Sequence, residues 1–327
     1  MKKIRWGIAG PGIIANKFAE AIRNVEGAEL VAVASRSAER AKEFASEHNI
    51  ANSFTSYEEM AASPLVDAVY VSTIHPYHKS VAEVFLNAKK HVLCEKPLCI
   101  NEYQAKKLKE CAKSNGVFLM EAMWTRFLPA VQYAVDLAKN GEIGEILGLD
   151  VDFCYRTTKK EENKLFENEV AGGSVLDVGV YTLHLAAMLF GSEPESVTAV
   201  ANVEDGVDLH THMLLKYKGG KTASLSSAIA VEKPETAYIY GADGMIILPM
   251  FFQADKLIVR KNGENKEILM PYDGNGFEGE IEELLKCVAD GKKESDILPL
   301  DESIDVIKQM DVIREQIGVC YPFEGEK

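Results

Sequence analysis

One group of side chains in this sequence carries the chemistry of proton transfer. Asp177, Tyr181 and His184 follow one another at spacings of four and three residues inside the apolar run "VLDVGVYTLHLAAMLFG". Residues at these spacings share one face of a helix, and polar groups on a buried helix need partners. A phenol is a poor base at neutral pH unless a neighbouring cation lowers its pKa. Lys96, in "HVLCEKPL", is a candidate for that cation.

A second motif, Gly10-x-Gly12-x-x-Ala15, predicts a dinucleotide site because it follows the apolar run "KIRWGIA" and opens a helix. Gly10 allows a tight turn, and Gly12 lets a pyrophosphate approach the main chain at the positive end of the helix. Ala15 allows close packing of the helix on the strand. A glycine turn used only for packing is the alternative, and the strand–turn–helix context favours the nucleotide. Ile13 and Ile14 are included among the expected cofactor-binding residues.

The end of the second strand indicates which nicotinamide cofactor is preferred. An acid at this place binds the ribose hydroxyls and repels a 2′-phosphate. This chain has Ser35-Arg36-Ser37 there instead. A guanidinium pairs with phosphate and stacks on adenine, and serine hydroxyls donate to the same oxygens. We therefore expect NADP(H) to be preferred, with NAD(H) as the alternative.

Further polar residues follow the later strands of the same region. Thr73, His75 and His78 lie just beyond "VDAVYVS", and Glu95 and Lys96 end "HVLCEK". Parallel strands present their carboxyl ends at one edge, where ligands bind, so all five are candidates for contact with the cofactor. On spacing alone, Lys96 could equally be a surface lysine before a loop-starting proline, and His78 could simply begin a helix.

The elements that position these residues follow two patterns. Up to residue 122, short apolar strands alternate with helical segments, which predicts a Rossmann fold, a doubly wound parallel sheet covered by helices. From residue 123 the strands are longer and of period two, which predicts an α+β domain with an open, mainly antiparallel sheet. We therefore expect a dinucleotide-binding domain in 1–122 and a substrate-binding and oligomerisation domain in 123–327. For the last helix, 301–318, we leave open that it packs back near the first domain.

The strand "ILGLDVDFCY" illustrates the second pattern. Leu147, Leu149, Val151 and Phe153 alternate with glycine, aspartate and cysteine residues. This period of two predicts that these four side chains share the buried face of the sheet.

Composition excludes several classes of partner. The 327 residues include 36 lysines and arginines against 50 aspartates and glutamates, a net charge of −14. Such an acidic chain, with no basic run, argues against nucleic acid or an anionic membrane as main partner. We find no apolar run approaching the roughly 18 residues of a membrane span and no secretion signal at the start, and expect a cytoplasmic protein. His210 and His212 share a strand face, but no acid or cysteine is clearly paired with them, so no metal is expected.

Several stretches together resemble the Gfo/Idh/MocA oxidoreductase family. They are the glycine motif, "STIHPYH" at 72–78, "CEKPL" at 94–98, "EAMWTRFLPA" at 121–130 and "AGGSVLDVGVYTLHLAAMLFG" at 171–191, in the family's order. The resemblance covers essentially the whole chain. Within the family, "EAMWTRFLPA" and the tyrosine of "LDVGVY" most resemble the dimeric dihydrodiol dehydrogenases and their NADP-dependent D-xylose dehydrogenase relatives.

The resemblance implies a role for each residue that matches a family motif. Lys96 matches the EKP lysine, which contacts the nicotinamide side and the substrate hydroxyl. Tyr181 matches a tyrosine that acts as general acid/base, assisted by that lysine. Asp177 would orient Lys96 or the substrate, and His184 is either a substrate contact or a core histidine. Inositol-dehydrogenase-like relatives carry a histidine where this chain has Tyr181, which disfavours inositol substrates.

The "EAMWTRF" segment falls at the expected domain junction. The resemblance implies that Trp124 and Arg126 lie near the nicotinamide, and the alternative for Trp124 is a packing anchor at the hinge.

We thus expect an NADP(H)-dependent oxidoreductase. It would move a hydride between the nicotinamide and a secondary hydroxyl or hemiacetal carbon of a small sugar, polyol or trans-dihydrodiol. The family also implies a homodimer or homotetramer formed through the second domain's sheet. Two alternatives stay open: a non-catalytic NADP(H)-sensing regulatory protein, against which the pairing of Lys96 with Tyr181 argues, and a family member that uses bound nicotinamide in glycoside cleavage.

Overall fold

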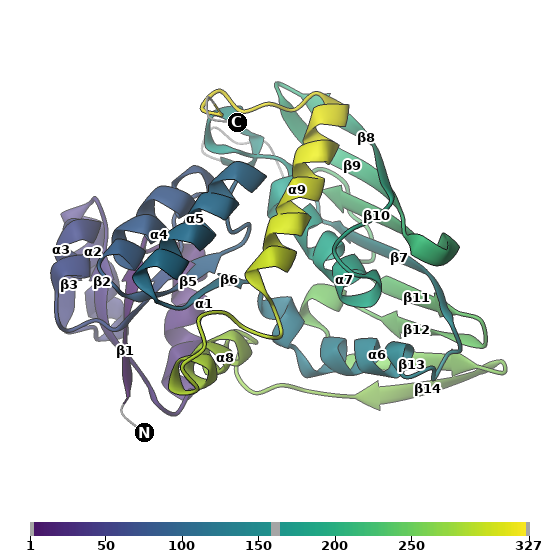
Figure 1. The fold of residues 1–327 in the computed structure, drawn as a ribbon, viewed down its shortest axis with the longest axis horizontal. Helices are drawn as coiled ribbons and strands as arrows, with labels where there is room; N and C mark the ends of the chain where they lie inside the picture. The colour runs from purple at the N-terminus through teal and green to yellow at the C-terminus, as the bar shows by residue number, and fades with distance from the viewer. Residues whose placement is uncertain (1–2, 158–163, 325–327) are drawn as a thin grey trace. The chain divides into compact units, whose positions relative to one another are not determined.

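The computed structural model describes residues 3–157 and 164–324 (Figure 1). The chain forms two units: unit 1 contains Met1–Trp124 and Asp273–Ser303, and unit 2 contains Thr125–Tyr272 and Ile304–Lys327.

Unit 1 contains a six-stranded sheet in which every neighbouring pair is parallel, in the order β3-β2-β1-β4-β5-β6. This order is that of the Rossmann fold, so the predicted fold is confirmed. Strands β4, β5 and β6 are buried over almost their whole length, as is typical of parallel strands with helices on both faces of the sheet. They are β1 (Ile4–Ala9), β2 (Ala28–Ala34), β3 (Asn52–Phe54), β4 (Ala68–Val71), β5 (His91–Glu95) and β6 (Leu119–Ala122).

Helices α2 (Ala38–His48) and α5 (Glu102–Asn115) of unit 1 begin directly after a residue with a capping side chain. Ser37 Oγ accepts a hydrogen bond from the Arg40 N–H at the start of α2, and Asn101 Oδ1 accepts one from the Gln104 N–H at the start of α5, which satisfies N–H groups left open at a helix start. Helices α4 and α5 pack on one another (Figure 1). The helices are α1 (Ile13–Ala21), α2 (Ala38–His48), α3 (Tyr57–Ala62), α4 (His78–Asn87), α5 (Glu102–Asn115) and α8 (Glu278–Ala289).

Helix α8 departs from the predicted domain boundaries. The sequence predicts one division at 122/123, whereas residues 273–303 return to unit 1. The physical reason is the apolar face of α8, which buries Ile281 and Leu284 in that unit. A hydrogen bond from Asn24 Nδ2 to Glu278 Oε1 (3.1 Å) also fastens the start of the helix there.

Unit 2 contains an eight-stranded sheet in the order β14-β13-β12-β11-β7-β10-β9-β8. Its neighbouring pairs are antiparallel except β7 and β10, which are parallel. The predicted open, mainly antiparallel sheet is therefore confirmed. Its strands are β7 (Ile146–Cys154), β8 (Ser196–Glu204), β9 (Val207–Lys216), β10 (Thr222–Ala228), β11 (Ala237–Gly241), β12 (Gly244–Leu248), β13 (Lys256–Lys261) and β14 (Glu264–Leu269).

One side chain of β7 departs from the predicted alternation. Leu149, Val151 and Phe153 are buried, but Leu147 is 49% exposed. The pairing of β7 with β11 shifts at this point, where Tyr240 pairs with Gly148 but Gly241 pairs with Ile146. Such a bulge leaves one residue unpaired and breaks the period of two.

Helices cover one face of the unit 2 sheet. Helix α6 (Pro129–Lys139) contacts β12 and β13, and α7 (Val180–Phe190) contacts β7 and β10. Helix α9 (Leu300–Ile317) lies on the same side (Figure 1). No helix covers the other face among the described residues, so that face is open.

Helix α7 is the centre of the unit 2 core. A π turn at Val175–Gly179 leads into it. By length and composition, the helical stretch Asn168–Phe190 could cross a membrane, contrary to the expectation that no such run exists. However, 83% of its most apolar window is buried inside the protein. This degree of burial is typical of a core helix.

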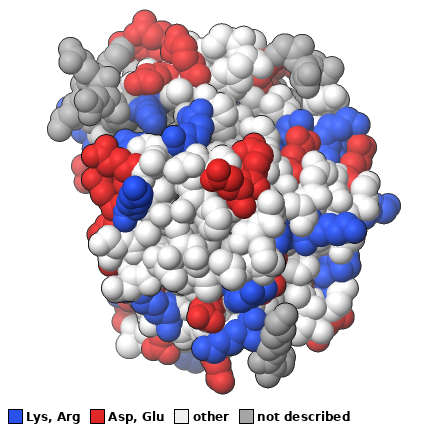
Figure 2. All heavy atoms as spheres, turned by 90° about the vertical axis from the view of Figure 1, so that its left-hand side faces the viewer, with Lys and Arg blue, Asp and Glu red and all other residues white. Residues whose placement is uncertain are grey.

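The surface mixes charges of both signs. Figure 2 shows acidic and basic side chains interspersed on one face of the molecule, rather than basic ones gathered in a patch.

Candidate functional site

The glycine turn of unit 1 has the geometry of a nucleotide-binding turn. Gly10 adopts a φ of +95°, and a Cβ there would lie 2.9 Å from Thr73 Cγ2. A Cβ on Gly12 would meet nothing nearer than the Gly10 carbonyl oxygen at 4.0 Å, so the main chain is open to an approaching group. Among the described residues no side chain caps the first N–H groups of α1, which leaves them available to an anion. The turn therefore fits a pyrophosphate.

The residues that follow this turn differ in exposure. Ile13 is 89% exposed at the first position of α1, Ile14 is half-buried, and Ala15 is fully buried against the sheet. Close packing at Ala15 is what brings the start of the helix to the strand ends.

The end of β2 presents a cation and no acid. Arg36 is exposed, and its guanidinium carbon lies 4.9 Å from the centre of the Tyr77 ring, which suits a cation–π contact. Ser35 is buried, and its Oγ accepts a hydrogen bond from the Ser37 N–H at 3.2 Å. Arg36 is thus held at the place where the ribose-binding acid of NAD-type sites stands.

Strand β5 brings Glu95 and Lys96 to the carboxyl edge of the sheet. Tyr70 Oη donates to Glu95 Oε1, and the Lys96 N–H donates to Glu95 Oε2 at 3.2 Å. The following Lys96–Pro97 peptide is cis. Burial raises the pKa of Glu95 to about 7, because desolvation outweighs the hydrogen bond from Tyr70 and the charge of Lys96.

His78 contacts the loops at this edge of the sheet through both ring nitrogens. The ring is fully buried, with Nδ1 2.8 Å from the Pro97 carbonyl oxygen and Nε2 2.9 Å from that of Thr73. It therefore ties the loop after β4 to the loop after β5 instead of facing solvent, where a cofactor would meet it. Burial lowers the pKa of His78. The half-buried His75 lies beside it, with the ring centres 5.8 Å apart.

Two residues of unit 1 support the site although the sequence did not single them out. The buried carboxylate of Glu121 accepts a hydrogen bond from the Leu98 N–H at 2.9 Å, which fastens the loop after Lys96. The Phe277 ring stacks on that of Trp124, with ring centres 5.4 Å apart. Glu121 stands inside the "EAMW" motif, which is a usable signal, whereas nothing in the sequence links Phe277 to Trp124.

In unit 2, Asp177 has a hydrogen-bonded partner that the sequence did not single out. Tyr155 Oη donates to Asp177 Oδ2 at 2.7 Å. Burial and then the Asp177 charge raise the pKa of Tyr155. Tyr181, 7% exposed, packs its ring 5.1 Å from that of Phe153. Phe153 and Tyr155 are two residues apart, so the period of two predicts that their side chains lie on the same face of the sheet. This spacing is the sequence signal that could have identified Tyr155.

The helix that carries these groups is not a uniform α-helix. Asp177 lies in the π turn, whereas Tyr181 and His184 lie in α7. A π turn closes i→i+5 hydrogen bonds, and such turns are frequent at functional sites. The predicted single face with α-helical spacing is therefore altered between Asp177 and Tyr181.

His184 and Arg126, both buried, come together in unit 2. Arg126 Nη1 lies 3.3 Å from His184 Nδ1. Because a guanidinium only donates, Nδ1 accepts and the ring proton is carried by Nε2. The structure thus joins two residues that the sequence singled out separately.

The predicted site residues divide between the two units. Those in unit 1 are Gly10, Gly12, Ile13, Ile14, Ser35, Arg36, Thr73, His75, His78, Glu95, Lys96 and Trp124, and those in unit 2 are Arg126, Asp177, Tyr181 and His184.

His210 and His212 lie side by side on β9, with ring centres 4.5 Å apart. Burial lowers the pKa of both, and Nε2 of His210 is 3.2 Å from Ser226 Oγ. Within 3–157 and 164–324, no group of three or more histidine, cysteine, aspartate or glutamate residues could hold a metal ion.

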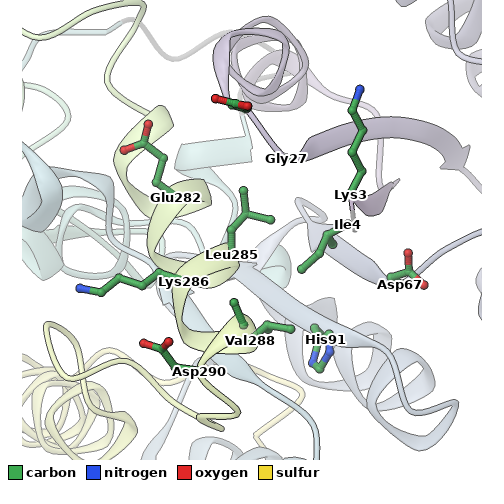
Figure 3. A pocket seen from close by; sticks show the side chains of 12 residues that line it. Lys3, Ile4, Gly27, Asp67, His91, Glu282, Leu285, Lys286, Val288 and Asp290 are labelled. Carbon is green, nitrogen blue, oxygen red and sulfur yellow. The ribbon is translucent and has the colours of Figure 1, made fainter. Parts of the chain in front are cut away.

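A pocket of about 760 Å³ lies at the opposite, amino-terminal edge of the unit 1 sheet (Figure 3). Its lining includes Lys3, Gly27, Asp67 and His91, which stand at or before the starts of strands, together with residues of α8. Ligands of such folds bind at the carboxyl ends of the strands, so this pocket is separate from the glycine turn.

Comparisons with known proteins agree with this geometry. Residues 4–123 match the model of an oxidoreductase family with an NAD-binding Rossmann fold, and residues 131–247 match the GFO/IDH/MocA C-terminal domain. Trans-1,2-dihydrobenzene-1,2-diol dehydrogenase of Mus musculus is 36% identical over 337 residues, covering 98% of each chain. The enzyme of the same name from Xenopus tropicalis is 37% identical, covering 97% of this chain and 99% of that protein.

Solved structures are similar over the same length. A 3-ketoreductase from Actinomadura kijaniata, in complex with NADP and TDP-benzene, has a TM-score of 0.88 at 26% identity, covering 97% of this chain and 98% of that chain. An aldose-aldose oxidoreductase from Caulobacter crescentus, complexed with glycerol, has a TM-score of 0.89 at 24% identity, covering 96% and 97%, and shows the shared fold. The chain therefore belongs to the Gfo/Idh/MocA oxidoreductase family and is an NAD(P)-binding oxidoreductase.

Proposed function

We propose that the chain is an NADP(H)-dependent dehydrogenase that oxidises a secondary hydroxyl of a trans-dihydrodiol or a hydroxyl or hemiacetal carbon of a small sugar. The observation that carries the proposal is the cluster of polar side chains at the π turn and α7. In this cluster Tyr155 donates a hydrogen bond to Asp177, and Tyr181 is close enough to Tyr155 to affect its pKa. The names of the relatives support the diol, and the name of the similar 3-ketoreductase supports the interconversion of a secondary hydroxyl and a ketone in a wider class of substrates.

The preference for NADP(H) is supported by the end of β2. Arg36 stands over the Tyr77 ring at the place where an acid would favour NAD(H). A guanidinium there pairs with a 2′-phosphate through charge-assisted hydrogen bonds. The 3-ketoreductase with NADP bound is a further support.

The residues of this chain would handle the proton, since the nicotinamide, when bound, supplies the acceptor or donor of the hydride. Tyr181 takes the proton of the substrate hydroxyl during oxidation and returns it during reduction. Lys96 is the cation that stabilises the phenolate form of Tyr181. Asp177, fixed by the Tyr155 hydrogen bond, orients the substrate hydroxyl.

A substrate panel separates this function from its rivals. The protein is mixed with NADP⁺ or NAD⁺ and trans-1,2-dihydrobenzene-1,2-diol, D-xylose, D-glucose or glycerol, and the absorbance of reduced nicotinamide is followed. We expect turnover with the diol or a sugar and more with NADP⁺. Binding of NADP⁺ without turnover on any compound would favour the sensor, and cofactor that is never released would favour glycoside cleavage. In Lys96→Ala, we expect kcat to fall by about 100-fold or more.

We also propose that a second copy of this chain covers the open face of the unit 2 sheet. Met213 and Leu215 are buried under the helices, so Leu214 between them points to the open face, where it is 60% exposed. Val200 is 66% exposed and pairs directly opposite His212 on that face. Adjacent exposed apolar side chains on a wide sheet mark an association surface, and identical surfaces pair by a two-fold axis.

The oligomer proposal is tested by changing the surface without touching the core. Leu214→Lys is expected to convert a dimer or tetramer into a monomer in sedimentation, because charges then face one another across the two-fold axis. Lys139→Glu, an exposed residue of α6 on the helix-covered side of the sheet, is the control and should leave the mass unchanged. A wild-type monomer at high concentration would contradict the proposal.

A further inference from the structure

Unit 2 contains a fully buried carboxylate, Asp208, that lies outside the residues discussed so far. It stands at the second position of β9, and its Oδ2 accepts three hydrogen bonds. The donors are Ser174 Oγ at 2.7 Å, the Val175 N–H at 2.8 Å and Thr211 Oγ1 at 3.1 Å. Such a convergence of donors on one oxygen is a built arrangement, because a buried carboxylate is costly unless it is hydrogen-bonded.

Two of these donors lie where the π turn begins. Ser174 is the residue before the turn, and the Val175 N–H is one of the groups that a helix start leaves without a partner. A negative charge at this end also interacts favourably with the helix dipole. Asp208 thus caps this helical segment from a strand that is 33 residues away in sequence.

The same segment is tied to a second strand. Ser174 Oγ lies 2.9 Å from Ser227 Oγ and 3.2 Å from the Ser227 carbonyl oxygen, on β10. The start of the π turn is therefore fixed against two neighbouring strands of the sheet. Asp177 follows Val175 by two residues and Tyr181 follows it by six.

The close approach of Asp208 explains a glycine of the "AGGSV" stretch. Gly173 has a φ of +119°, and a Cβ on it would lie only 2.2 Å from Asp208 Oδ1. Any other residue at Gly173 would push the carboxylate away from the helix start. Burial raises the pKa of Asp208, while the hydrogen bonds from Ser174 and Val175 favour its ionised form.

We propose that Asp208 is a positioning residue, whose carboxylate fixes the place and direction of the π turn and thereby the positions of Asp177 and Tyr181 for proton transfer. The proposal rests on the proposed function of these two residues. In this proposal Asp208 contacts neither the substrate nor the cofactor.

The test compares Asp208→Asn with two matched controls. Gln316→Ala removes the side chain of α9 whose Oε1 accepts a hydrogen bond from the Ala199 N–H on β8 (2.8 Å), and Ser192→Ala removes the bond from Ser192 Oγ to Asp305 Oδ2 (2.6 Å) beyond the other end of α7. All proteins are measured for thermal stability, NADP⁺ affinity, and kcat and KM with the best substrate of the panel, over a range of pH.

In Asp208→Asn, we expect kcat to fall about tenfold while NADP⁺ affinity stays within about twofold. The apparent pKa in the pH dependence of kcat should also shift in Asp208→Asn, because the surroundings of the Tyr181 hydroxyl change. The two controls should keep kcat within about twofold even where they lower the unfolding temperature. If Asp208→Asn does not fold, Ser174→Ala carries the test, with the same direction expected.

Full kcat in Asp208→Asn, or in Ser174→Ala where that variant is used, would overturn the proposal. Equal losses of kcat in Asp208→Asn and Ser192→Ala would also overturn it, since they would show general destabilisation. Tyr181→Phe distinguishes a failure of the proposed function from a failure of the positioning role. If Tyr181→Phe keeps turnover, the proposed function is wrong. If Tyr181→Phe is inactive while Asp208→Asn is fully active, only the positioning role of Asp208 is wrong.

Discussion

Glu95 makes the stability of unit 1 depend on pH in a direction that the structure fixes. Glu95 is 6% exposed, and burial raises the pKa of its carboxyl from 4.5 to about 7. The folded state therefore binds this proton more tightly than the unfolded state. The resulting stabilisation is fully present below about pH 4.5 and is lost as the pH rises through about 7.

The magnitude follows from the size of the shift. At about 1.4 kcal/mol per pKa unit, the rise from 4.5 to about 7 corresponds to about 3 kcal/mol of unfolding free energy. Glu280, a second buried carboxyl whose pKa is raised by burial and by the Glu95 charge, acts in the same direction. The other groups that act on Glu95 are Tyr70, Lys96 and Glu121, and they are common to the wild type and a Glu95→Gln variant.

Urea unfolding followed by tryptophan fluorescence measures the pH dependence of the unfolding free energy of unit 1. The chain has two tryptophans, Trp6 and Trp124, and both lie in unit 1. Between about pH 4.5 and about pH 8, we expect the wild type to lose about 3 kcal/mol more than Glu95→Gln. Glu282→Gln, an exposed carboxylate of the same unit, is the control and should follow the wild type. Parallel curves for Glu95→Gln and the wild type would refute the reasoning.

Two further predictions concern cofactor binding. Arg36→Ala should raise the KM for NADP⁺ by about 10- to 100-fold and leave the KM for NAD⁺ nearly unchanged, because only the 2′-phosphate loses a partner; equal changes for both cofactors, measured by initial rates, would contradict this. Gly10→Ala should weaken NADP⁺ binding and destabilise unit 1 by about 1–3 kcal/mol, since the φ of +95° disfavours a side chain and the new Cβ would lie 2.9 Å from Thr73 Cγ2. Wild-type affinity in calorimetry together with an unchanged unfolding temperature would show that this turn tolerates a side chain.

The sequence predicted the sheets well because their signals are local. Alternating strands and helices predicted the parallel sheet, and period two predicted the antiparallel one. The return of α8 to unit 1 was not predictable in this way, because an apolar helix face shows that it is buried but not where. The exposure of Leu147 depends on a bulge in its pairing with β11, which a single strand does not reveal.

The site residues show the same limit. Glycine spacing identified the turn around Gly10 because its geometry is set within a few residues. The burial of His78 between two loops and the hydrogen bond from Tyr155 to Asp177 join segments that are distant in sequence. The contact of Asp208 with the start of the π turn spans 33 residues and has no local pattern. Motif spacing therefore proposes candidate reacting groups, whereas the contacts that hold such groups in place join segments distant in sequence.

Removing one oxygen atom tests the central claim most directly. Tyr181→Phe keeps the ring that packs on Phe153 and loses only the hydroxyl. With the substrate identified by the panel, we expect NADP⁺ to bind as in the wild type and kcat to fall by about 100-fold or more, with little remaining pH dependence. A variant that turns over at the wild-type rate would contradict the assignment of the phenol as the group that moves the proton.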